Sequence, residues 1–191
     1  ELRFKGKRQF AVEANRVLAK LENTHRLLLE KICLLKNMNP ELIFSLTQDF
    51  DTLRILTVLS QETVILSQIG MNPPQFKLNA IFRDALIDNL RQQSVFNEIL
   101  ESTLETLLNH NEVRQATSIL IEIGETARLN EILNNRDLLN VINASIQDSI
   151  VRGASQELKD WLAVAPYLSG EGRIGEIVLN FYISLLSLNF K

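Results

Sequence analysis

Apolar side chains recur every three or four positions along most of the chain, which is the period of a helix with one buried face. The repeat is clearest between Ser94 and Leu133. Ser94 can cap a helix that continues to Leu108. Asn111 can cap a second helix, which Gly124 can end because glycine accepts a left-handed turn at little steric cost. A third, shorter helix follows to Leu133, and the short connections predict that all three pack together.

The N-terminal region shows the same period over a longer stretch. Apolar positions step by three or four from Lys7 to Lys36, close to a heptad repeat. This spacing predicts one helix of roughly 40 Å at about 1.5 Å per residue. Extra leucines widen the apolar stripe, which favours packing against more than one neighbour.

Two Asn-Pro sequences and one aspartate suggest further helix starts. Asn39-Pro40-Glu41 combines a capping side chain, proline at the first helical position and an acid near the positive end of the dipole. Asp51 can cap a following helix that would run to Gly70, although Thr63-Val64-Ile65 within it favours a strand. Asn72-Pro73-Pro74 repeats the capped start and predicts another helix.

Beyond the central stretch, the pattern predicts helices starting at Asp137 and Ser155 and a last helix over Arg173–Phe190. Seven Gly and four Pro leave little room for the turns of an all-β fold. No linker rich in Pro, Gly or Ser divides the chain. We therefore expect an all-α fold: one domain over residues 1–191, with eight to ten helices in a single bundle or a short helical stack.

The overall charge and the longest apolar run limit the expected partners. The net charge of −3 argues against a dedicated nucleic-acid binder, so no nucleic-acid partner is expected. Residues 1–36 carry nine Lys or Arg and four acids, a net of +5, and the remainder carries −8. The uncharged run Ile177–Phe190, which no other uncharged run exceeds, is shorter than the roughly twenty apolar residues of a membrane span, so no span is expected.

The first residue and the cysteine content suggest the cellular context. The chain starts with Glu rather than Met and shows no signal-peptide pattern, which predicts a fragment excised from a larger protein. Its single cysteine, Cys33, excludes an internal disulfide and fits a reducing compartment, so we expect a cytoplasmic protein.

No arrangement of reactive side chains predicts an enzyme, a cofactor or a metal site. His25 and His110 have no ligand at helical spacing that would complete a metal pattern. His25 and Cys33 lie about 12 Å apart along one predicted helix and could not form a nucleophile pair. Cys33 is flanked by Ile32 and Leu34 and is interpreted as a core thiol.

Two charged clusters are candidate partner-binding sites. Glu98, Glu101 and Glu105 form a carboxylate stripe on one helix face, which is either a solvated face or a docking surface for a basic partner. Lys7 and Arg8 belong to the only basic and aromatic cluster of the chain. That cluster either contacts phosphates or an acidic protein groove, or is the solvated beginning of a helix.

Four landmarks follow one another along the chain: Lys7-Arg8, the capped start at Asn39, the run Lys77–Phe82, and the leucine-rich helix ending in Gly124. Their order resembles the formin homology domain, an actin-assembling family, over about residues 2–129. The resemblance implies a cytoskeletal function with actin as a candidate partner. The chain departs from the family at Ala14, where a larger isoleucine would contact actin.

We therefore predict a non-enzymatic helical interaction module within a larger assembly. A groove between helices would take an amphipathic partner helix, anchored by apolar residues and oriented by charges on the rim. A formin-like actin binder is the alternative. The sequence leaves the identity of the protein partner and the oligomeric state open.

Overall fold

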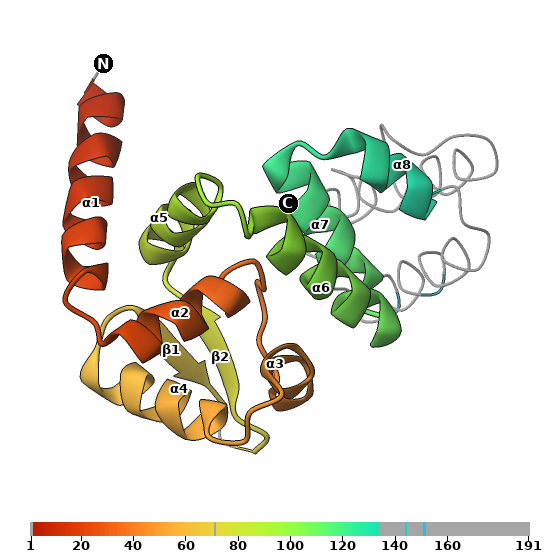
Figure 1. Ribbon diagram of the computed structural model, residues 1–191, viewed down its shortest axis with the longest axis horizontal. Helices are drawn as coiled ribbons and strands as arrows, with labels where there is room; N and C mark the ends of the chain where they lie inside the picture. Colours follow the sequence, from red (N-terminus) through yellow and green to blue (C-terminus); the bar gives the residue numbers. More distant parts are fainter. Residues whose placement is uncertain (1, 71, 134–143, 145–150, 152–191) are drawn as a thin grey trace, which may run out of the picture. The chain divides into compact units, whose positions relative to one another are not determined.

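A computed structural model describes residues 2–70, 72–133, 144 and 151 (Figure 1). The chain divides into two compact units, Glu1–His110 and Asn111–Lys191. The described part is mainly helical, as predicted, but a small sheet corrects the all-α expectation. The first unit contains α1 (Leu2–Leu18), α2 (Asn23–Ile32), α3 (Pro40–Thr47), α4 (Thr52–Glu62), β1 (Leu66–Ile69), β2 (Gln75–Leu78), α5 (Ala80–Leu90) and α6 (Phe96–Asn109). In the second unit, the described residues form α7 (Val113–Ile123) and α8 (Thr126–Leu133). The helices predicted from Asp137 onward lie outside the described residues.

The sheet is a hairpin of β1 and β2, extended by a short bridge. The strands pair antiparallel, with Leu66 opposite Leu78. On the other side of β2, Met38 and Phe76 exchange two backbone hydrogen bonds of 3.1 and 2.8 Å. β2 therefore lies between β1 and the segment that precedes α3.

The hairpin corrects two predicted helices. The helix expected from Asp51 to Gly70 ends at Glu62, and the segment after the prolines is β2 rather than helix. Phe76 is buried and Lys77 is exposed, which is the two-residue period of a strand with one buried face. The next helix, α5, starts later and is capped by Asn79, whose side chain accepts from the amide of Ile81 at 3.2 Å.

The long helix predicted over Lys7–Lys36 is also wrong, because the chain bends at residues 19–22. The last turn of α1 tightens, with the amide of Lys20 bonding to the carbonyl of Val17 at 3.1 Å. Ala14 and Leu18 are buried on a helix that contacts α5. The core face of α2 is formed by different residues, so the break lets each helix bury its own stripe.

The segment between α2 and α3 runs through the core, and α3 begins as predicted. Cys33, Leu34, Leu35 and Met38 are fully buried. The Asn39 side chain accepts from the amide of Leu42 at 2.8 Å and caps α3. α3 and α4 are joined by residues 48–51, a turn of the length found in helix-turn-helix units.

The three helices predicted between Ser94 and Leu133 are confirmed. Their starts differ slightly: Val95 and Glu112 occupy the capping positions of α6 and α7, and neither makes a side-chain cap bond. Gly124 ends α7 in a left-handed conformation with φ of 82°, as expected.

Candidate functional site

Helix α2 has two apolar faces, and only one of them belongs to the core. Leu29 and Ile32 are fully buried. Thr24, Leu27, Leu28 and Lys31 are spaced as i, i+3, i+4 and i+7, and they line a groove on the outer side of the helix. The Leu27 side chain remains 49% exposed. The outer face of α2 is therefore an apolar surface that the described fold leaves open.

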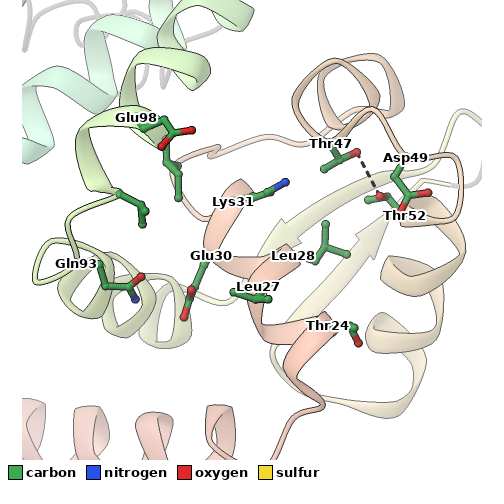
Figure 2. Close-up of a pocket in the computed structure, with 12 residues that line it drawn as sticks. Thr24, Leu27, Leu28, Glu30, Lys31, Thr47, Asp49, Thr52, Gln93 and Glu98 are labelled. Carbon is green, nitrogen blue, oxygen red and sulfur yellow. Dashed lines mark hydrogen bonds between the residues drawn. The ribbon is translucent and has the colours of Figure 1, made fainter.

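The groove has a volume of about 560 Å³ and lies between two walls (Figure 2). One wall comes from the end of α3 and the start of α4: Thr47, Asp49 and Thr52. The other comes from the segment leading into α6 and its first turn: Gln93, Val95, Glu98 and Ile99. A hollow of about 140 Å³ shares Lys31, Glu98 and Ile99 with the groove and adds Leu46 and Ser102. The groove thus continues between α3 and α6.

Hydrogen bonds hold the wall at the α3–α4 turn. Thr52 donates its hydroxyl to Thr47 at 3.2 Å (Figure 2). Thr47 in turn donates to the carbonyl of Ile43 at 2.8 Å. The Asp49 carboxylate accepts from the amide of Asp51 at 2.9 Å. These bonds fix a short turn, so this wall is preformed.

The charges that line the groove are mostly negative. Glu30, Asp49 and Glu98 are opposed by Lys31 alone among the lining residues. The Glu30 side chain is only 12% exposed, and its ion pair with Arg26 is 3.7 Å long. In Figure 2, Glu30 points toward Gln93, whereas Lys31 points into the groove between Glu98 and Thr47. The groove therefore combines an apolar floor with an acidic rim.

The structure separates the predicted site residues. Glu98 lines the groove, whereas Glu101 and Glu105 are exposed on α6 outside its lining. Lys7 and Arg8 lie within α1, and their side chains are outside what the structure describes. Sequence reasoning missed the contribution of α2, although the extra leucines that widened its stripe were a signal for it.

Cys33 and His110 both form hydrogen bonds within the fold. Burial raises the pKa of the Cys33 thiol to about 12, and the thiol donates to the carbonyl of Glu30 at 3.2 Å. His110 bonds through Nδ1 to the carbonyl of Thr106 at 2.8 Å, and its Nε2 lies 3.3 Å from the Ser45 hydroxyl. Within the described ranges, no group of three or more His, Cys, Asp or Glu could hold a metal ion. In the same ranges, no helix is both long and apolar enough to cross a membrane.

The order of α2–α4 and the hairpin can be compared with a known family. A helix, a bridging residue, a helix-turn-helix pair and a β-hairpin follow one another. Residues 14–98 are similar to the MalT winged helix domain. Helices α3 and α4 and the hairpin of β1 and β2 all lie within this matched range. No curated protein matches the sequence.

The match to the MalT winged helix domain overturns the resemblance to the formin homology domain. The landmarks of that resemblance were capped helix starts and leucine-rich helices, which recur in unrelated helical proteins. One landmark, the run Lys77–Phe82, is the end of β2 and the start of α5 rather than one helix. Actin therefore loses its support as a candidate partner.

The same match corrects the exclusion of nucleic acid. Winged helix domains are an interaction and DNA-binding type of fold, so nucleic acids and regulatory proteins are both partner classes to consider. The net charge of −3 was insufficient for the exclusion, because it averages a basic N-terminal stretch with an acidic remainder.

Proposed function

We propose that this chain is a non-enzymatic, regulatory protein-interaction domain, and that the groove between α2, α3 and α6 receives a helix of a partner protein. The observation that carries this proposal is the exposed apolar floor of the groove. Leu27 is 49% exposed and Val95 39% exposed, and both line the groove beside Leu28 and Ile99. Apolar side chains gathered in a concave surface with a polar rim are typical of a site that binds another protein.

The size of the groove suits a helix anchored by a few side chains. A volume of about 560 Å³ exceeds what one side chain fills, and the floor of α2 presents its residues over two helical turns. Completing the burial of a half-exposed leucine contributes about 1 kcal/mol. A few such anchors give the modest affinity expected of a regulated contact.

Nucleic acid is the second candidate, favoured by the winged helix match. In a helix-turn-helix unit the second helix enters the major groove, which assigns that role to α4, with the wing beside it. Residues 38–79 contain two basic residues, Arg54 and Lys77, and four acids. Arg54 is also paired with Asp51 at 3.2 Å. Because phosphate contacts supply much of the affinity for DNA, this balance ranks the protein partner first.

Photo-crosslinking in cells that express this chain distinguishes the two candidates. One variant carries a photo-reactive phenylalanine analogue at Leu27 in the groove, and the other carries it at Gln61, an exposed position on α4. We expect Leu27 to crosslink to one defined protein segment, and Ile99→Glu to abolish that product. A Gln61 product with nucleic acid, together with none from Leu27, would replace the protein partner by the second candidate.

A further inference from the structure

We infer that the helix received by the groove is a basic amphipathic one, with Leu, Ile or Val anchors flanked by Lys or Arg. This inference rests on the proposed function and adds the chemistry of the partner. It is carried by the distribution of charge over the two walls and by the position of one carboxylate, Glu30, whose side chain is only 12% exposed.

Each wall contributes one carboxylate and no basic side chain to the lining of the groove, Asp49 on one side and Glu98 on the other. Residues 37–53, which hold α3 and the following turn, contain three acids and no Lys or Arg. Residues 92–113, which hold α6, contain four acids and no Lys or Arg. The fold brings these two segments to opposite sides of one groove, because α3 contacts α6. Their fields add in the space between them, and a low-dielectric wall weakens that field less than open water does.

Glu30 supplies a specific position for a cation of the partner. Its side chain is 12% exposed and lines the groove, yet its ion pair with Arg26 is longer than a hydrogen bond, at 3.7 Å. A carboxylate that is largely shielded from water interacts strongly with a cation placed beside it. A lysine or arginine entering the groove beside Gln93 would give Glu30 a close partner and exclude water from both groups.

Lys31 determines where the partner helix should lack a positive charge. It is the one cation among the described lining residues, and it points into the groove between Glu98 and Thr47 (Figure 2). A basic residue opposite Lys31 would be repelled. The partner helix should therefore place an uncharged or acidic residue against Lys31 and its basic residues on the flanks that meet Glu30, Asp49 and Glu98.

Three dye-labelled helical peptides test this inference by fluorescence anisotropy against the 191-residue chain. They share leucines at i, i+3, i+4 and i+7, and their flanks carry Lys, Gln or Glu. A few partly screened charge pairs together change affinity by about tenfold. We expect the Lys peptide to bind about tenfold more tightly than the Gln peptide at low salt, and the Glu peptide to bind more weakly than both.

Matched variants locate the effect. Glu30→Gln and Glu98→Gln should each weaken the Lys peptide by roughly threefold and leave the Gln peptide unchanged. Glu105→Gln removes the same charge from an exposed position of α6 outside the groove and should have a smaller effect. Leu27→Glu should abolish binding of all three peptides.

The other outcomes separate the inference from the proposed function. Equal affinity for the three peptides, with all binding lost in Leu27→Glu, would refute the charge pattern and leave the docking groove intact. If neither Leu27→Glu nor Glu98→Gln changes the affinity for the Lys peptide, both the charge pattern and the docking groove are refuted. Light scattering of the chain alone measures its oligomeric state. A dimer that is lost in Leu27→Glu would show that a second copy of the chain occupies the groove, and would refute the basic helix of another protein as the occupant.

Discussion

Replacing two leucines of α2 by alanine, one at a time, should separate folding from binding. Leu27→Ala and Leu29→Ala remove the same three carbon atoms from positions two residues apart on one helix. Leu29 is 0% exposed, whereas Leu27 is 49% exposed. We expect Leu29→Ala to lower the free energy of unfolding by about 3 kcal/mol, since a fully buried site loses transfer energy and gains a cavity. Leu27→Ala should lower it by less than about 1 kcal/mol, because half of the side chain already contacts water and alanine favours the helix slightly.

Urea unfolding of the 191-residue chain, followed by circular dichroism at 222 nm, measures both values. The same variants should rank in the opposite order in binding. Leu27→Ala should weaken the Lys peptide by about fivefold, equal to about 1 kcal/mol. Leu29→Ala should leave the affinity of the folded fraction nearly unchanged. If Leu27→Ala destabilises the fold as much as Leu29→Ala does, Leu27 is a core residue and the open groove does not exist in solution.

Three further predictions concern the stability of the fold. Asn39→Ala should lower the free energy of unfolding by about 1 kcal/mol in urea titrations by removing the α3 cap, whereas Ser at the same position should retain most of it. Gly124→Ala should cost about 1 kcal/mol by the same assay, since φ is 82° and a Cβ there meets nothing within 4 Å; no loss would mean that the turn differs. The free energy of unfolding should fall by about 1.4 kcal/mol per pH unit between pH 9 and pH 12, because the Cys33 pKa rises from 9.0 to about 12 on folding and the unfolded thiol ionises first. The Cys33→Ala variant should lack this contribution, and an identical slope in the variant would refute the assignment.

Local signals in the sequence were sufficient for several elements and misleading for others. Asn39-Pro40-Glu41 starts a helix, because the asparagine caps it and proline fits the first position. Asn72-Pro73-Pro74 contains the same dipeptide but lies in the hairpin loop. Proline after asparagine favours a turn as much as a helix start, and only the following side chains decide between them. There, Phe76 and Leu78 alternate with exposed residues, and strand pairing with β1 uses that alternation.

The long N-terminal helix shows a different limit. No Gly or Pro interrupts Lys7–Lys36, so helix propensity and period alone predict continuity. The interruption at residues 19–22 comes from tertiary contacts. Ala14 and Leu18 are buried, α1 contacts α5, and Asn89 of α5 donates to Asn15 of α1 at 2.8 Å. A pattern that serves two separate neighbours looks in sequence like one broad stripe.

The groove depends both on local sequence signals and on tertiary contacts. Leu27, Leu28 and Leu29 are consecutive, and successive helical residues are turned by about 100°, so three of them span more than half of the helix surface. Packing against one core buries only one side of the helix. The sequence therefore indicates a second contact surface on α2. It gives no sign of the walls, because residues 47–52 and 93–99 are distant from α2 in sequence and lie beside it only in the folded chain. Glu98 shows the consequence: the carboxylate stripe was visible as a pattern, but only the position of α6 beside α2 and α3 distinguishes Glu98 from Glu105. A docking site assembled from distant segments in this way depends on the fold for its shape and on the local sequence for its charge.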